Sequence, residues 1–322
     1  MLLRHENNTT EQLGDPNGES KLTKFSKYPN LAPELRHHIL LCLGKNTLCN
    51  YAECSNYCNL EVQKFNTVAP ISMFFDEDID SITVLANYYV KGEEPIYRPL
   101  LAVKKYFPIS DESKEKKIQN FVHQTYRYVQ TGKTRGVSIK LKKWPKKLMN
   151  ITQLRQVDSW NVTMCKSMLN DFMDYFKTTD TKIRRLCLEN CDNAAERVTI
   201  PSMFFKSDFV KTLDHLYVDV LCSIGPTDFV NLPNRNIFIR SSLDFEAICQ
   251  KVERINAGGT NKVEFIAIRL PENDTRLFEC NELFPIERFP QQRIDVNNIC
   301  EIGKVRIDTF SGSKFLHIRV IK

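Results

Sequence analysis

From about residue 150 the sequence repeats a short pattern of alternating apolar residues, and this repeat restricts the fold more than any other feature of the chain. The runs return roughly every 20 to 30 residues, a period typical of repeat-built domains. They are Leu154–Val157, Leu186–Leu188, Leu216–Val218, Ile237–Ile239 and Ile266–Ile268. Alternation over so few positions predicts short strands. Because a helical or irregular stretch fills each interval, the chain is expected to alternate strands with helices, as an α/β domain does.

Two of these intervals carry apolar residues at helical spacing. Residues 161–178 place Met164, Met168, Phe172 and Phe176 on one face, and residues 244–255 do the same with Phe245, Ile248, Val252 and Ile255. Apolar side chains three or four positions apart lie on one side of a helix. Both segments are therefore predicted to be helices that pack on the strands.

One run resembles a known repeat family. Leu186-Cys187-Leu188-Glu189-Asn190-Cys191 is similar to the strand-and-asparagine core of a leucine-rich repeat, and the other runs keep the apolar spacing without the asparagine. The resemblance implies an irregular leucine-rich-repeat-like α/β solenoid whose sheet presents an extended protein-binding surface. The possible target-binding residues alternate with the inward apolar ones: Arg185, His215, Tyr217, Phe238, Arg240 and Arg269. A solvated strand face, or burial under the C-terminal segment, remains the alternative for this side.

The segment after Phe284-Pro285 changes character. Arg293–Asp295, Lys304–Phe310 and Phe315–Ile321 alternate with period two, and Ser311–Ser313 has the composition of a hairpin turn. These features predict an antiparallel β-hairpin that caps the edge strand of the preceding sheet.

The remaining chain divides by composition into three parts. Residues 1–27 are polar and are predicted to form a flexible arm, and residues 28–65 contain two short amphipathic helices. Residues 66–135 are predicted to be linking strands, followed by a helix over Asp111–Gln130. The repeat domain with its cap then occupies residues 136–322.

The segment 28–65 resembles an F-box. The family begins with a Leu-Pro-x-Glu-Leu pattern, continues with apolar residues four and eight positions on, and ends in a small-residue and cysteine step. The residues that match are Leu31, Pro33, Glu34, Leu35, Ile39, Leu43, Leu48, Ala52 and Cys54. Ala32 stands where the family has its first proline, and no tryptophan follows the Cys54-Ser55 step.

The F-box resemblance implies a non-enzymatic function. F-box helices bind the Skp adaptor of an SCF-type ubiquitin ligase, which connects them to a cullin scaffold, and repeats that follow an F-box bind a substrate protein. A helix pair of this length is too small to bury its own apolar face, so its leucines need a partner surface. That surface is either the adaptor or the rest of this chain. In the second case the protein is a binding scaffold with no ubiquitin role.

The composition weighs against several other functions. The net charge is +6, and the densest basic run is Lys140–Lys147, with Trp144 inside it. A nucleic-acid surface would use these lysines on phosphates and the tryptophan on bases, but a solvated loop is the preferred interpretation. No catalytic motif, signal peptide or apolar span is present, so we expect no cofactor, no metal, no membrane contact and a cytoplasmic or nuclear location.

Overall fold

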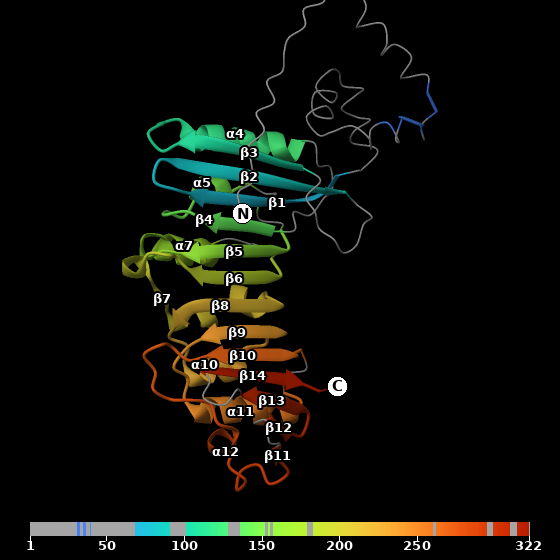
Figure 1. Cartoon of the computed structure of the whole chain (residues 1–322), viewed down its shortest axis with the longest axis vertical. Helices are drawn as coiled ribbons and strands as arrows, with labels where there is room; N and C mark the ends of the chain where they lie inside the picture. Colours follow the sequence, from blue (N-terminus) through green and yellow to red (C-terminus); the bar gives the residue numbers. More distant parts are fainter. Residues whose placement is uncertain are drawn as a thin grey trace, which may run out of the picture. The chain divides into compact units, whose positions relative to one another are not determined.

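The computed structural model describes residues 31–32, 35–36, 39, 68–90, 101–127, 136–151, 154, 157–178, 183–259, 262–294, 299–309 and 314–321. The chain divides into two compact units, Met1–Thr67 and Val68–Lys322. The second unit is a mixed α/β structure built on one large, mostly open sheet (Figure 1). All the described side chains of the hydrophobic core belong to this second unit.

Strands and helices follow one another along the second unit, as the repeat predicts. The strands are β1 (Val68–Glu77), β2 (Ser81–Val90), β3 (Leu101–Pro108), β4 (Gly136–Lys140), β5 (Ser159–Met164), β6 (Arg185–Asn190), β7 (Thr199–Ile200), β8 (His215–Cys222), β9 (Asn236–Arg240), β10 (Phe265–Arg269), β11 (Arg293–Ile294), β12 (Ile299–Ile302), β13 (Val305–Thr309) and β14 (Phe315–Val320). The α-helices are α4 (Lys114–Arg127), α5 (Lys146–Met149), α7 (Leu169–Thr178), α8 (Ser202–Lys206), α9 (Asp208–Thr212), α10 (Pro226–Asn231), α11 (Phe245–Asn256) and α12 (Cys280–Leu283).

The order of the strands follows the chain over the middle of the sheet. Across the sheet the order is β11-β12-β13-β14-β10-β9-β8-β6-β5-β4-β1-β2-β3, and β7 pairs with β8. From β1 through β4, β5, β6, β8 and β9 to β10, each strand pairs in parallel with the next. Antiparallel strands extend both edges: β2 and β3 beside β1, and β14 to β11 beside β10. The pairing of β14 with β10 forms the antiparallel cap that the alternation in the C-terminal segment predicts.

The two faces of the sheet differ in burial. In β5, Trp160 and Val162 are buried, whereas Asn161 between them is half-buried, and β9 alternates in the same way. Figure 1 shows the helices α4, α7, α10 and α11 behind the sheet. The buried side chains therefore face these helices. We call the opposite face, which carries Asn161, Tyr217 and Phe238, the open face.

An aromatic cluster forms the core under the helices around β4 and β5. Trp144 and Phe172 meet edge to face with ring centroids 5.1 Å apart, and Trp160 lies against both Trp144 and Phe176. The polar atoms at the rim of the cluster are partly satisfied, since the Tyr175 hydroxyl donates to the backbone oxygen of Met149 over 2.9 Å. Large aromatic side chains contribute most of the apolar area in such a layer, so this cluster fixes α7 on the sheet.

Side-chain caps and a proline define where three of the helices that connect the parallel strands begin. Asp244 accepts a 2.7 Å hydrogen bond from the backbone N–H of Ala247 and caps α11. Ser207 caps α9 in the same way through Val210, and Pro226 opens α10, where a missing N–H costs nothing. These local signals fix where α9, α10 and α11 begin.

The first predicted strand of the repeat is wrong. Leu154 lies in a helical turn, and the strand of this interval is β5 (Ser159–Met164) instead. Both Leu154 and Val157 are buried, but short apolar runs do not distinguish a helical turn from a strand. The predicted helix over 161–178 consequently begins later, as α7 (Leu169–Thr178).

The expected boundary at residue 136 does not correspond to a break in the sheet. β1 pairs in parallel with β4, so the segment predicted to link two domains supplies the strands β1, β2 and β3 of the same sheet. The division found in the chain lies instead between Thr67 and Val68. The helix expected over Asp111–Gln130 is present as α4 (Lys114–Arg127).

Candidate functional site

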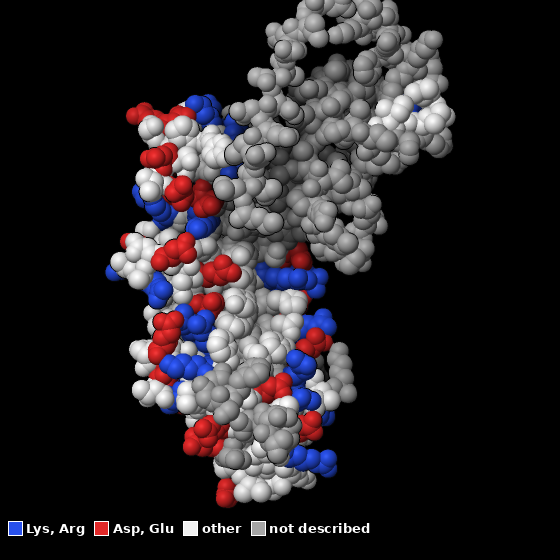
Figure 2. Space-filling model, viewed as in Figure 1, with Lys and Arg blue, Asp and Glu red and all other residues white. Residues whose placement is uncertain are grey.

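An uncharged row of side chains runs across the open face. Strand register places one residue of each neighbouring strand in this row. Its members are Phe74, Ser138, Asn161, Cys187, Tyr217, Phe238, Ala267 and His317. Where no grey atoms cover this face in Figure 2, white side chains lie in the middle of the sheet, with charged side chains on both sides of them. A protein surface with an uncharged centre and a charged rim is typical of interfaces.

Tyr217 and Phe238 form the most prominent aromatic contact in this row. Their rings stack with centroids 4.1 Å apart and an angle of 16° between the planes. Tyr217 is 38% exposed, so one face of the pair is open to a partner. Rigid aromatic side chains of this kind bury a large area at little entropic cost and are enriched among the residues that dominate binding energy.

Arg240 and Arg269 lie side by side next to this pair, at the same register of β9 and β10. Arg269 forms an ion pair of 3.2 Å with Asp219 and lies over the Phe315 ring at 5.2 Å. Arg240 pairs with Glu272 at 3.1 Å. Each positive charge therefore has its own carboxylate, which allows two guanidinium groups to stand on adjacent strands.

Arg185 and His215 lie at the other end of neighbouring strands on the same face, at paired positions. Arg185 contacts Asp158 at 3.6 Å, and the Nδ1 atom of His215 is 2.8 Å from the side-chain nitrogen of Asn236. Burial and the neighbouring Arg185 hold the pKa of His215 below its ordinary value. This shift favours the neutral imidazole, which forms the hydrogen bond with Asn236.

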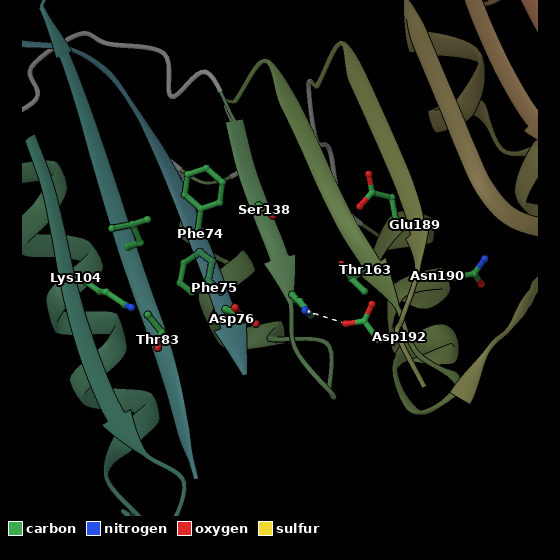
Figure 3. A pocket seen from close by; sticks show the side chains of 12 residues that line it. Phe74, Phe75, Asp76, Thr83, Lys104, Ser138, Thr163, Glu189, Asn190 and Asp192 are labelled. Carbon is green, nitrogen blue, oxygen red and sulfur yellow. Dashed lines mark ion pairs between the residues drawn. The ribbon is translucent and has the colours of Figure 1, made fainter. Parts of the chain in front are cut away.

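The structure thus places all six residues that alternation selected from the repeat on one continuous face. What the sequence does not indicate is a hollow at the far end of this face, over β1 to β6. We call it the β1–β6 pocket. Its volume is about 460 Å³ and Figure 3 shows its lining residues: Phe74, Phe75, Asp76, Thr83, Leu85, Lys104, Ser138, Lys140, Thr163, Glu189, Asn190 and Asp192.

The charges in the β1–β6 pocket are unevenly matched. Lys140 forms an ion pair of 3.1 Å with Asp192 (Figure 3). The hydrogen bond to Asp192, together with the charges of Asp192 and Asp76, raises the pKa of Lys140. Lys104 extends along β3 over the Tyr106 ring, with 4.8 Å between its nitrogen and the ring centroid. The surroundings of Lys140 are therefore electronegative, although the chain as a whole is basic.

The thiols beside these surfaces are not activated. Burial raises the pKa of Cys187, on the open face, to about 12, and it raises the pKa of Cys222, on the helix-covered side, to about 12. Because the thiolate is the nucleophilic form, neither group is ready for covalent chemistry at neutral pH. Within the described ranges, no group of three or more His, Cys, Asp or Glu residues could hold a metal ion. The described open face offers contacts for a binding partner.

Two of the residues matched to the F-box pattern, Leu35 and Ile39, have exposed side chains. Leu35 and Ile39 lie in helical backbone and are 56% and 38% exposed. Leu31 precedes this helix and is half-buried. The other matched positions lie outside the described residues: Pro33, Glu34, Leu43, Leu48, Ala52 and Cys54.

The basic run at Lys140–Lys147 does not have the geometry of a nucleic-acid surface. Trp144, which would have to stack on bases, is 4% exposed and belongs to the aromatic core. Lys146 and Lys147 form ion pairs with Asp171 and Glu115 at 2.8 Å each. The aromatic group is buried and these lysines are paired. The expected solvated loop is present only in part, because the run begins at the end of β4 and ends inside α5.

A scan against protein-family models found no matching family, and searches of curated proteins and of solved structures found no match. Among the described helices, none has both the length and the apolar composition that crossing a bilayer requires.

Proposed function

We propose that this chain is a non-enzymatic substrate receptor of an SCF-type ubiquitin ligase. The open face carries the proposal, because a large sheet face with stacked aromatic and arginine side chains lies uncovered by the described helices. Receptors of this kind need such a face for the target and a separate apolar element for the adaptor. The expected partners are the Skp adaptor, the cullin scaffold behind it, and a target protein.

We further propose that the second unit is a degenerate leucine-rich-repeat solenoid. Parallel strands that pair in chain order, with helices on one side, support this interpretation. The side chain of Asn190, in the segment that resembles the repeat core, donates to the backbone oxygen of Asp219 on the next strand of the sheet over 3.0 Å. That contact ties neighbouring repeats, which is the role that the family resemblance implies for this asparagine.

The contact with the adaptor is proposed to involve Leu35 and Ile39. Residues four apart lie on the same face of a helix, and both side chains are exposed although they are apolar. An apolar helix face that inserts into a groove of its partner is a recurrent mode of recognition. The F-box resemblance identifies that partner as the Skp adaptor.

The receptor would act by proximity. Holding a target beside the conjugating enzyme raises the effective concentration of its lysines without any chemistry by the receptor itself. The described open face fits this role because it offers contact area and hydrogen-bonding groups rather than an activated nucleophile. Its aromatic pair, Tyr217 and Phe238, is the expected centre of the target interface.

Recovery of the Skp adaptor with the purified full-length chain tests the proposal. We expect the wild-type chain to retain the adaptor and the Leu35→Asp/Ile39→Asp double variant to lose at least nine-tenths of it, roughly the tenfold effect of 1.4 kcal/mol. Ile79→Asp is the matched control, because Ile79 is also apolar and is 80% exposed, but lies outside the F-box-like segment. Equal background recovery from wild type and double variant would exclude the ligase role and leave a binding scaffold.

A further inference from the structure

We infer that Cys165 and Cys191 form a redox-sensitive modification site, at which a low-molecular-weight disulfide oxidises the two thiols to an internal disulfide bond. The two cysteines lie one residue beyond the carboxyl ends of the neighbouring parallel strands β5 and β6. Both are free thiols in the structure. The inference goes beyond the ligase role and does not depend on it.

Strand register brings the two cysteines side by side. The last pair of the β5–β6 ladder joins Met164 to Asn190, and the backbone N–H of Cys191 donates to the oxygen of Met164 over 3.2 Å. Cys165 keeps an extended backbone, with φ −113° and ψ 155°, so it continues the direction of β5. Neighbouring strands lie about 4.8 Å apart, and disulfides join residues whose Cα atoms are about 4.4 to 6.8 Å apart. The backbone of this pair is therefore within range of a disulfide bond.

The side chains of the pair lie in the same pocket. Both line a hollow of about 310 Å³ at the carboxyl ends of the parallel strands, and the two thiols hydrogen-bond each other. The Cys165 sulfur has a long contact of 3.9 Å to the backbone oxygen of Leu141. The Cys191 sulfur lies 3.4 Å from the backbone oxygen of Asn193. Because both residues lie beyond the regular ladder, a small movement of the two loops can bring the sulfurs to bonding distance.

The exposure of the two thiols sets the order of the reaction. Cys165 is half-buried, whereas Cys191 is 9% exposed, so the oxidant meets Cys165 first. The Cys165 thiolate attacks one sulfur of the small disulfide, and the other half leaves as a thiol. Cys191 then attacks the Cys165 sulfur of this mixed disulfide and releases the second half as a thiol. The cysteines lose two protons and two electrons in total, and the small disulfide takes up both to become two thiols.

The pair is suited to this reaction by proximity rather than by an activated thiolate. Burial and the Cys191 thiol, followed by the carboxylates of Glu196 and Glu77, raise the pKa of Cys165 to about 11. Since the thiolate is the attacking form, the exchange is slow at neutral pH and faster at mildly alkaline pH. A lowered thiol pKa would stabilise the reduced form and destabilise a disulfide, and Cys165 shows the opposite shift. The disulfide is therefore expected to persist once it forms.

A second pair of thiols provides an internal comparison. Cys280 and Cys300 also hydrogen-bond each other, but they are 1% and 0% exposed. An oxidant does not reach these sulfurs while the chain is folded. Among these two thiol pairs of the described chain, the more exposed one at the end of β5 and β6 is the expected site of oxidation.

Treatment of the full-length chain with oxidised glutathione at mildly alkaline pH, followed by a non-reducing tryptic digest and mass spectrometry, tests the inference. Cleavage after Arg155 and Lys166 places Cys165 in peptide 156–166, and cleavage after Arg185 and Arg197 places Cys191 in peptide 186–197. We expect these two peptides to be linked in most chains, with a mass two hydrogen atoms below their sum. A reducing agent should separate them again.

Peptide 186–197 also contains Cys187, so two serine variants identify the bonded sulfur. Cys187→Ser is the matched control, because Cys187 lies on the same strand, and this variant should keep the link. Cys191→Ser should lose the link and stop at the mixed disulfide between Cys165 and glutathione. The peptides that contain Cys280 and Cys300 should remain unlinked in the folded chain.

Three results would each overturn the inference. The first is a wild-type chain in which Cys165 stays free or stops at the mixed disulfide with glutathione. The second is a link that survives in Cys191→Ser, and the third is a bond from Cys165 to any cysteine other than Cys191.

Discussion

Lys251 lies in an environment that a charged side chain seldom occupies. It is fully buried in α11, and its ammonium donates to the backbone oxygens of Val230 and Leu232 at the end of α10, over 3.1 Å and 2.7 Å. Two carbonyl groups orient the amine but do not replace a counter-charge. Burial therefore lowers the pKa of Lys251 from 10.5 to about 7.

This shift predicts that the free energy of unfolding rises with pH. Between pH 7 and about 10.4 the unfolded chain binds one proton more at Lys251 than the folded chain, so stability increases by up to about 1.4 kcal/mol per pH unit. Below pH 7 the folded state carries the full cost of the buried charge. Urea unfolding of wild type and Lys251→Met at pH 6, 7, 8 and 9 measures the difference. Identical slopes against pH would show that the buried amine does not change its charge in this range.

Some residues of the open face could be predicted from the sequence, and others could not. Alternation with buried leucines and isoleucines was sufficient to select Tyr217, Phe238 and Arg269, because period two fixes the face of every residue once the strand is known. The β1–β6 pocket was not predictable in this way. Phe74 and Lys140 come together only because β1 pairs directly with β4, although β2 and β3 lie between these two strands in the chain. Such a long-range pairing leaves no local signal in the sequence.

At the scale of elements, the turn between β12 and β13 depends on one glycine. Gly303 has a φ of +57°, which side chains disfavour. A Cβ atom there would lie 2.8 Å from the Oδ1 atom of Asn256. That oxygen accepts from the N–H of Lys304, and the Asn256 amide nitrogen donates to the oxygen of Ile302. The end of α11 and the turn of the C-terminal cap are therefore joined through Asn256.

We predict that Gly303→Ala lowers the free energy of unfolding by about 2 to 3 kcal/mol. The left-handed backbone accounts for about 1 to 2 kcal/mol, and displacement of Asn256 accounts for the rest through its lost hydrogen bonds. Chemical denaturation of Gly303→Ala, Asn256→Ala and the double variant separates the backbone contribution from the Asn256 contribution. When Asn256 is already replaced, Gly303→Ala should cost only the backbone contribution. Additive losses would contradict the proposed contact.

The same turn illustrates which elements could be predicted. The two long alternating strands of the cap, β13 and β14, followed from their period-two pattern. β12 was missed because Ile299–Ile302 is short, and its register with β13 is set by Gly303 rather than by a longer pattern. Helix α11 was predicted almost to the residue, since its apolar spacing and its cap at Asp244 agree. The strand expected at Leu154–Val157 is absent. Leu154 and Val157 are buried there, and a buried helical turn gives the same apolar pattern in the sequence as a short strand.

At the scale of the whole molecule, the important question is whether the second unit needs the first. The described core extends from Met73 to Ile318 and includes no residue before Val68. Both edges of the sheet end in antiparallel strands, so the parallel repeat is protected by its own chain. By contrast, Leu35 and Ile39 are exposed apolar residues of the first unit. All the described core residues of the sheet thus come from the second unit itself.

We therefore predict that a fragment spanning residues 68–322 folds cooperatively and melts within about 3 °C of the full-length chain, a difference of about 1 kcal/mol for a domain of this size. A receptor whose F-box-like helices bind another protein requires this independence. Helices that are bound to the adaptor cannot also stabilise the sheet. Circular dichroism melts of the fragment and the full chain, compared at equal concentration, provide the measurement. An insoluble fragment, or one that melts more than 10 °C lower, would instead show that the helical pair stabilises the sheet, as expected for a scaffold with no adaptor.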